Sequence, residues 1–214
     1  NDLPLALLPK VGRMLGKLHQ ALKDYPLPFG MSEQWLDSIS ADSVIAKYDE
    51  LIQIAESKAD ADKLPQLMDD LQYKKQLAVR CEDFKKYYNG ITYCSTHGDF
   101  QGCQLIWEKG EIKAVIDFSA AACLPVIWEI MRSFVQSSNV CRTTATIDIA
   151  ALCDYVREYI KFFPLTKNDM IAMPYVYLFQ LAQSSYGYPQ YLLNTDSEDR
   201  EGLLRFAFWR TQMC

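Results

Sequence analysis

Apolar residues along the chain recur mainly at helical spacing. From position 5 to position 22 they return every three or four residues, the period of an amphipathic helix. The stretch 25–30, which contains two prolines and a glycine, interrupts this pattern and predicts a linker. Helical patterns then continue to position 88, and the helices expected there cover 35–39, 44–55 and 64–88, with a polar loop at 58–63 and Gly90 as the C-cap of the last one.

The pattern changes to short β-prone runs at Ile91. Three such runs cover 91–94, 104–107 and 112–116, and the glycine-containing stretch 108–111 suits a hairpin turn between the last two. From Pro125 onward the spacing is helical again, and Thr166 with Asp169 resembles a capping box. The helices expected here cover 126–135, 147–163, 166–185 and 198–213.

This order predicts an α+β fold that is predominantly helical, with a small hairpin-bearing sheet in its middle. A chain of 214 residues, half of them apolar, can bury one core with a helical appendage. The net charge of -5 comes without a basic stripe, so nucleic acid is not an expected partner. No run of about 18 apolar residues and no basic-then-apolar leader is present, so neither a membrane span nor a secretory signal is expected.

The seven cysteines are scattered and show no C-x-x-C spacing. This distribution favours neither a disulfide framework nor a zinc site, and it is typical of reduced thiols. A cytoplasmic location is therefore expected.

Candidate chemistry gathers around the predicted sheet. His97-Gly98-Asp99 follows the first β-prone run, Gln104 opens the second, and Asp117 closes the hairpin. Phosphoryl transfer needs a carboxylate to receive the proton of the accepting hydroxyl and oxygen ligands that hold Mg²⁺ against the phosphates. Asp99 and Asp117 suit these two roles, while Gly98 permits a tight turn and His97 can hold Asp99 in place by hydrogen bonding.

The segment from His97 to Asp117 resembles the Brenner motif of the aminoglycoside phosphotransferase and choline kinase group, His-Gly-Asp, four residues, Asn, then Ile-Asp-Phe or Ile-Asp-Trp. The two aspartates are 18 positions apart, as in the family. By this resemblance Asp99 is the catalytic aspartate, and Gln104 and Asp117 bind the metal ion that holds the nucleotide. Residues 15–19 and 125–130 also resemble helices of these enzymes.

The resemblance implies the C-terminal lobe of a protein-kinase-like phosphotransferase. Its expected parts are a helical insert at 30–90, the catalytic loop and metal-binding hairpin at 91–118, and a helical substrate-side subdomain at 119–214. It implies Mg²⁺, ATP or GTP as phosphate donor, and a small-molecule hydroxyl as acceptor, among them aminoglycosides, choline-like alcohols, homoserine and sugars. No glycine-rich phosphate loop and no strand lysine precede the motif, so an N-terminal nucleotide-binding lobe is expected to be absent and the chain alone to be inactive.

Gln104 stands where the family has asparagine, which keeps an amide oxygen but moves it by one methylene. This departure motivates an alternative, a pseudokinase-like binding or scaffold protein without turnover. A metallophosphoesterase is rejected, because such sites need several histidine ligands and the chain has only His19 and His97.

Other polar and aromatic residues are expected to be structural. His19 should be a buried hydrogen-bonding residue, and Glu129 should hold its helix against the catalytic loop by accepting backbone amides. Aromatic residues near the end of the chain should be packing residues rather than a cage for a cationic ligand; they are Tyr175, Tyr177, Phe179, Tyr186, Tyr188 and Tyr191.

Overall fold

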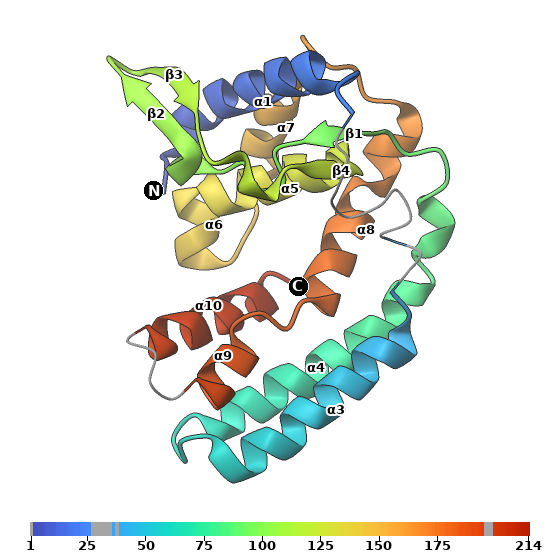
Figure 1. Cartoon of the computed structure of the whole chain (residues 1–214), viewed down its shortest axis with the longest axis vertical. Coiled ribbons are helices and arrows are strands. Elements are labelled where there is room, and N and C mark those ends of the chain that lie inside the picture. Colours follow the sequence, from blue (N-terminus) through green and yellow to red (C-terminus); the bar gives the residue numbers. More distant parts are fainter. Residues whose placement is uncertain (1, 27–35, 37–38, 195–198) are drawn as a thin grey trace. The chain divides into compact units, whose positions relative to one another are not determined.

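The computed structural model describes residues 2–26, 36, 39–194 and 199–214 and divides the chain into two compact units. The first unit contains Asn1–Leu36 and Tyr87–Tyr177, and the second contains Asp37–Lys86 and Leu178–Cys214. The boundary falls within helix α8 (Lys167–Gln183), whose first part belongs to the first unit (Figure 1). No helix of the described residues is long and apolar enough to span a bilayer.

The first unit combines helices with two small antiparallel β pairs. A 3-10 turn (Leu5–Leu7) leads into α1, and strand β1 pairs with β4 while β2 pairs with β3. The β2–β3 hairpin projects from the rest of this unit beside α1 in Figure 1. The elements are α1 (Leu8–Leu22), β1 (Tyr93–Thr96), β2 (Leu105–Glu108), β3 (Glu111–Val115), β4 (Ala122–Pro125), α5 (Val126–Ser137), α6 (Asn139–Thr144) and α7 (Ile149–Tyr159).

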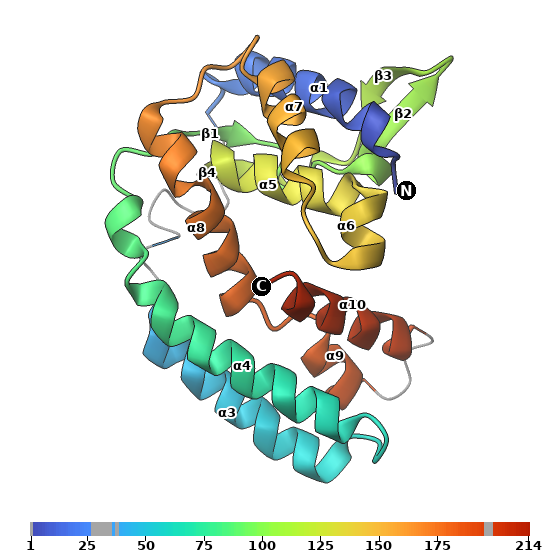
Figure 2. The ribbon, with the colours of Figure 1, turned by 180° about the vertical axis from the view of Figure 1, so that it is seen from behind.

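Helices α1 and α7 lie side by side at very short separation (Figure 2). Two glycines of α1 make this approach possible. A Cβ atom added to Gly12 would fall 2.4 Å from the carbonyl oxygen of Tyr155, and one added to Gly16 would fall 2.4 Å from that of Tyr159. Because these obstacles are backbone atoms of α7, a side chain at either position forces the helices apart.

The β2–β3 hairpin was predicted and is confirmed. Its two-residue turn has Lys109 and Gly110 at positive φ, 51° and 77°, as hairpin turns of matching twist require. The pairing runs from Leu105↔Val115 to the turn, with an irregularity after Ile106. Strand β4 was not predicted, and it forms because its backbone pairs with β1, from Thr96↔Ala122 to Tyr93↔Pro125. A partner so distant in sequence leaves no local pattern.

The second unit is helical, with α3 and α4 packed side by side as an antiparallel pair (Figure 1). Its helices are α3 (Ala41–Lys58), α4 (Leu64–Glu82), the end of α8, α9 (Tyr188–Leu193) and α10 (Arg200–Gln212). One apolar core joins α3, α4, α9 and α10, and its members include Tyr48, Leu67, Leu71, Tyr188, Leu192 and Leu204. Burial of four of the six late aromatic residues, Tyr177, Phe179, Tyr188 and Tyr191, agrees with their predicted packing role.

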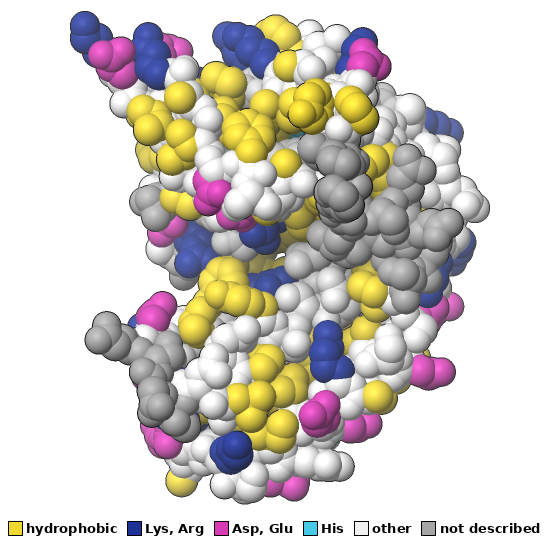
Figure 3. Space-filling model, viewed as in Figure 1, with side chains coloured by type: hydrophobic (Ala, Val, Ile, Leu, Met, Phe, Trp, Pro, Cys, Tyr) yellow, Lys and Arg dark blue, Asp and Glu magenta, His cyan; other side chains and the backbone are white. Residues whose placement is uncertain are grey.

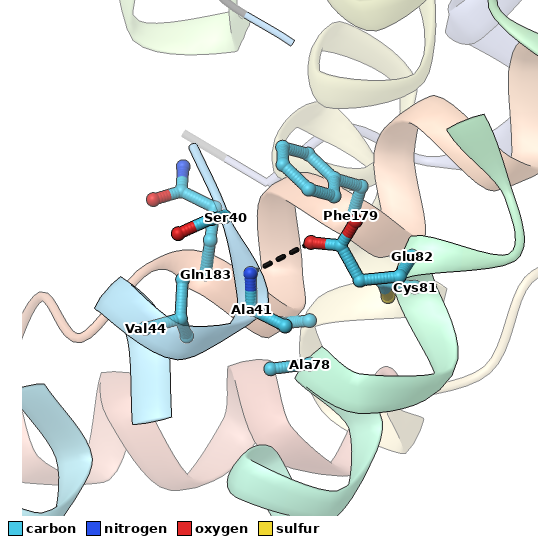
Figure 4. Close-up of a pocket in the computed structure, with 9 residues that line it drawn as sticks. Ser40, Ala41, Val44, Ala78, Cys81, Glu82, Phe179 and Gln183 are labelled. Atoms are coloured by element: carbon cyan, nitrogen blue, oxygen red, sulfur yellow. Dashed lines mark hydrogen bonds between the residues drawn. The ribbon is translucent and has the colours of Figure 1, made fainter. Parts of the chain in front are cut away.

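A side chain from the end of α4 caps the N-terminus of α3. The Ala41 amide donates to a Glu82 carboxylate oxygen at 2.6 Å, and the Ser40 hydroxyl accepts from the Ser43 amide at 3.3 Å (Figure 4). The cavity beside this contact has a volume of about 10 Å³. That is room for one water molecule at most, so the cavity is a packing gap rather than a ligand site.

Several predicted boundaries are wrong. Helix α4 ends at Glu82 rather than at Tyr88, because the amides of Asp83 and Phe84 turn to i−3 carbonyls and a separate 3-10 turn (Lys85–Tyr87) follows. Gly90 therefore lies in a turn, at φ 69°, and caps no helix. Helices α6 and α9 were not predicted, because a helix of six residues makes fewer than two turns and its apolar pattern has no room to repeat. The helix predicted at 35–39 lies outside the described residues except for Leu36, which is helical, and for Ile39.

The capping box before α8 is confirmed. The Thr166 amide donates to Asp169 at 2.8 Å and the Asp169 amide donates to the Thr166 hydroxyl at 3.1 Å. Asp169 is fully buried and also accepts from the amide and hydroxyl of Thr92, each at 2.7 Å. One carboxylate thus starts α8 and holds the segment that leads into β1.

Side-chain donors from α3 and α4 cap the C-terminal end of α8. Lys74 is fully buried and donates to the carbonyl oxygens of Leu181 and Ser184, both at 2.9 Å. Lys47 donates to a third carbonyl of this turn, and the Tyr48 hydroxyl donates to a fourth at 2.7 Å. The last carbonyls of a helix lack intrahelical partners and carry partial negative charge, so these donors satisfy and stabilise the helix end.

Replacing Gly16 with alanine should test the α1–α7 contact. The added methyl meets the Tyr159 carbonyl, so we expect the free energy of unfolding to fall by about 1–3 kcal/mol despite the higher helix propensity of alanine. Urea denaturation followed by circular dichroism measures this. Gly202→Ala in α10 is the matched control, because its methyl meets only the movable carboxylate of exposed Asp199. Equal stability of both variants would contradict tight helix contact.

Stability should also depend on pH through Lys74. Burial lowers its pKa to about 7, so between pH 7 and 8.5 the unfolded chain binds the proton that the folded chain has released. Folding stability therefore rises over this range, by about 1–2 kcal/mol, and the slope should disappear in Lys74→Met. Denaturation midpoints of wild type and Lys74→Met at several pH values measure it, because the difference between the two proteins removes the contribution of the thiols, whose ordinary pKa lies at the end of this range. A wild-type stability that falls relative to that of Lys74→Met with rising pH would show that the ammonium is the favoured buried form.

Candidate functional site

The candidate site begins in the loop between β1 and β2. Gly98 has a φ of 79°, and a Cβ atom there would fall 1.9 Å from the carbonyl oxygen of Ala120. Only glycine therefore allows the loop to lie directly against the segment that follows Asp117. This contact brings two stretches of the predicted site together although they are about 20 residues apart in sequence.

His97 joins the same two stretches by hydrogen bonds. Its Nε2 atom lies 2.8 Å from the carbonyl oxygen of Ile116, and its Nδ1 atom lies 3.3 Å from the amide of Asp99. Since the amide can only donate and the carbonyl can only accept, the neutral ring carries its proton on Nε2. The ring is fully buried and contacts the rings of Phe100 and Phe118. His97 thus fixes the position of Asp99 relative to the end of β3.

A buried carboxylate from α5 holds the start of the loop. Glu129 is fully buried and accepts hydrogen bonds from the backbone amides of His97, at 3.1 Å, and of Gly98. His19 of α1 lies 2.7 Å from the same carboxylate through Nε2, and its Nδ1 lies 2.7 Å from the Tyr159 hydroxyl of α7. The structural roles predicted for His19 and Glu129 are both confirmed.

Asp99 is surrounded by donors. Gln101 donates to both of its carboxylate oxygens at 3.0 Å, Gln104 donates at 3.4 Å, and Arg132 of α5 forms an ion pair with it. The carboxylate is 27% exposed. It is therefore fixed in orientation while one side remains open to a ligand.

Gln104 and Asp117 flank the hairpin, Gln104 directly before β2 and Asp117 two residues after the end of β3. The amide of Ile116 donates to the backbone carbonyl of Gln104 at 3.0 Å, next to Asp117. Asp117 itself is exposed, has a left-handed backbone with φ 60°, and accepts from the hydroxyl and amide of Ser119 at 2.6 and 3.3 Å. These hydrogen bonds hold the pKa of Asp117 below its ordinary value, so it stays ionised.

Of the predicted site residues, the structure brings Asp99 and Gln104 into contact. Asp117 makes no hydrogen bond to either of them within the described part of the chain, and only the backbone links it to Gln104. No three side chains among the described His, Cys, Asp and Glu residues gather closely enough to hold a metal ion. The oxygen donors present, two carboxylates and one amide, nevertheless fit Mg²⁺, which normally keeps water and phosphate oxygens as further ligands.

Two residues of the site were missed by the sequence analysis, Gln101 and Arg132. Arg132 follows Glu129 by three positions, so both side chains leave α5 on the same face, toward the loop. That spacing was a usable signal, because the helix and the role of Glu129 were both predicted. Gln101 had no such signal, since its contact depends on the course of the loop.

A large groove lies elsewhere in the first unit. Its volume is about 740 Å³ and its lining is mostly apolar, with Ile149, Leu152, Met170 and Met173 among the contributors. None of the predicted site residues lines it. The groove is therefore not part of the arrangement around Asp99.

Comparison with known proteins gives a structural match without a sequence match. No protein-family model matches the sequence, and no curated protein matches it. Among solved structures, the amicoumacin kinase hAmiN in complex with AMP-PNP, Ca²⁺ and Ami has a TM-score of 0.54 at 16% identity, over 98% of this chain and 59% of that chain. A choline kinase from Cryptosporidium parvum Iowa II has a TM-score of 0.48 at 14% identity, over 97% of this chain and 64% of that chain.

The match establishes the fold. At 16% identity it says nothing by itself about activity, and the chain spans less than two thirds of the length of either matched structure. The mostly helical composition with small antiparallel β pairs agrees with the prediction. The chain therefore has the kinase-like fold predicted from its resemblance to the aminoglycoside phosphotransferase and choline kinase group, as seen in the C-terminal lobe of these enzymes.

Proposed function

We propose that this chain is the catalytic part of a small-molecule phosphotransferase that moves the γ-phosphate of ATP or GTP to a hydroxyl group. The observation that carries the proposal is the loop geometry around Asp99. Its carboxylate is oriented by Gln101 and contacts the side-chain amide of Gln104. The backbone amide of Asp99 is linked through His97 to the carbonyl of Ile116, the residue before Asp117. A proton acceptor and two oxygen ligands thus come from one rigid assembly.

In the proposed reaction the acceptor oxygen forms a bond to the γ-phosphorus while the bond from that phosphorus to the bridging oxygen breaks, leaving the nucleoside diphosphate. The proton of the acceptor hydroxyl passes to the Asp99 carboxylate. Bound Mg²⁺ supplies neutralisation of phosphate charge, and Gln104 and Asp117 are the residues that would hold it. His97 and Glu129 keep the loop in place throughout.

The amicoumacin kinase offers limited support, since its structure was determined with a nucleotide analogue, a divalent metal ion and Ami. We propose the same classes of ligand for this chain, a nucleotide, a divalent cation and a small hydroxyl compound. The residues that bind the phosphates of ATP would belong to a lobe outside residues 1–214. Exposed apolar side chains near the site would pack against such a lobe. Ile106, Ile116 and Phe118 are 48%, 42% and 43% exposed. Apolar side chains also gather over the hairpin-bearing unit in Figure 3.

A second candidate is a nucleotide-binding protein without turnover. Two observations favour it, the glutamine at position 104 and the ion pair that occupies one oxygen of Asp99. Binding of Mg²⁺-nucleotide without phosphotransfer to a broad set of hydroxyl compounds would support this candidate over the enzyme.

Asp99→Asn in the intact protein should lower phosphotransfer by about 10²–10⁴-fold, because an amide cannot take up the acceptor proton. Nucleotide affinity should stay the same. Formation of nucleoside diphosphate in the presence of an acceptor mixture measures the rate. Asp154→Asn is the control, since this exposed carboxylate pairs only with Arg157 among the described residues. Undiminished transfer by Asp99→Asn would remove Asp99 from the role of base.

Asp117→Asn should raise the Mg²⁺ concentration needed for half-maximal activity by about 10-fold or more, because a neutral amide holds a hard cation less well. Gln104→Asn, which restores the residue of the related motif, should keep or increase activity. Glu108→Gln, on the exposed end of the same hairpin, serves as control. Identical Mg²⁺ dependence in wild type and Asp117→Asn would show that Asp117 binds no metal.

A further inference from the structure

Arg132 presents a cation to the open side of Asp99. It leaves α5 one turn after Glu129 and forms an ion pair with Asp99 through one Nη atom. Its guanidinium lies 5.6 Å from the ring centre of Trp128, and the side chain is 23% exposed. Packing against the indole fixes the guanidinium beside the carboxylate, where an acceptor molecule has to bind.

The hydrogen-bonding capacity of Arg132 is largely unused. A guanidinium offers five N–H donors in a planar fork, and its Nε is buried without a hydrogen-bond partner among the described residues. One Nη atom accounts for the described hydrogen bond to Asp99. An unsatisfied buried donor costs free energy, so a turn of the side chain that brings the fork to a ligand oxygen is favoured.

Asp99 does not depend on Arg132 for its orientation. Gln101 donates to both carboxylate oxygens and Gln104 donates to one of them. If the guanidinium turns to another anion, the carboxylate therefore keeps hydrogen-bond partners from its own loop. The ion pair is exchangeable at low cost, which distinguishes it from a buried pair whose separation leaves a lone charge.

The ion pair also competes with the proposed acceptor. A hydroxyl that donates to Asp99 must come within about 3 Å of one of its two oxygens. Arg132 contacts Oδ1, while Gln101 and Gln104 both donate to Oδ2. An acceptor that carries its own oxyanion near the hydroxyl draws the guanidinium away and delivers the hydroxyl to the freed oxygen. A cationic acceptor is repelled by the same guanidinium.

We propose that Arg132 binds an oxyanion of the acceptor, which is a carboxylate or a phosphate close to the hydroxyl that is phosphorylated. This inference rests on the function proposed above. The substrate class is then hydroxy acids or phosphorylated alcohols rather than aminoglycosides or choline-like cations. The phosphoryl group still passes from the nucleotide to the hydroxyl oxygen, and the hydroxyl proton still passes to Asp99. Arg132 acts on acceptor affinity and orientation, not on the proton.

The test compares matched acceptors with the intact protein and Mg²⁺-nucleotide. The carboxylate arm pairs 3-hydroxypropionate with 3-hydroxypropionamide, the phosphate arm pairs glycerol 3-phosphate with glycerol, and choline is the cationic acceptor. We expect wild type to prefer one anionic acceptor over its neutral partner by about 10-fold or more in kcat/KM, because hydrogen bonds to charged groups are worth about 1.5–3 kcal/mol.

Arg132→Met should remove this preference chiefly by raising KM for the anionic acceptor about 10- to 100-fold, with the neutral partner little affected. Arg132→Lys should recover part of the affinity, since it keeps the charge and loses the fork. Arg157→Met, an exposed arginine of α7, is the control and should behave as wild type. A merely structural role of Arg132 would lower kcat for both partners alike.

The outcomes separate the two proposals. Equal losses for anionic and neutral acceptors in Arg132→Met, or a wild-type preference for choline, overturn the role of Arg132 and leave the phosphotransferase intact. Phosphotransfer to none of these acceptors, with transfer to another class of alcohol, overturns the substrate class. Absence of transfer to any hydroxyl compound, despite nucleotide binding, overturns the proposed function and with it the inference.

Discussion

The buried carboxylate of Glu129 is the interaction on which the rest of the first unit depends. A charged group taken out of water is costly unless hydrogen bonds replace its hydration. Glu129 obtains these bonds from the backbone amides of His97 and Gly98 and from the ring of His19. One side chain thereby joins α5 to α1 and to the loop, and the Tyr159 hydroxyl extends the network to α7.

The position of Asp99 follows from this network. With the start of the loop fixed by Glu129, the ring of His97 spans from the Asp99 amide to the Ile116 carbonyl. Gly98 removes the Cβ atom that would hold the two segments apart. The two carboxylates of the candidate site thus lie on short irregular segments. Buried hydrogen-bonding groups of three helices anchor these segments, which gives loop residues the precision that the proposed catalysis demands.

The hydrogen-bond partners of Asp99 are of two kinds, those that its own loop holds in place and one that a ligand can displace. Gln101 and Gln104 belong to the same loop and orient the carboxylate locally. Arg132 comes from a helix and has donors to spare. With both kinds of partner, the carboxylate of Asp99 can keep its orientation while a ligand replaces one contact. The ion pair with Arg132 is therefore compatible with the proposed role of Asp99 as proton acceptor.

Much of this protein was determined by local sequence. Helical spacing located α1, α3, α5, α7, α8 and α10, because an amphipathic face repeats within one segment. The hairpin followed from its glycine, and the capping box from Thr166 and Asp169. His97, Asp99, Gln104 and Asp117 were predicted as site residues from their types, their spacing and the resemblance of their motif to a known family. The same resemblance implied the fold, which is confirmed.

What sequence could not decide depends on contacts between distant segments. The β1–β4 pair, the end of α4, and the requirement for glycine at Gly12 and Gly16 each depend on a partner far along the chain. Arg132 belongs to the site only because α5 folds back beneath the loop, 33 residues after Asp99. Sequence by itself therefore determined the fold class and the candidate site residues, and the tertiary structure decided which neighbours surround them, because hydrogen bonds and close packing act through space and not along the chain.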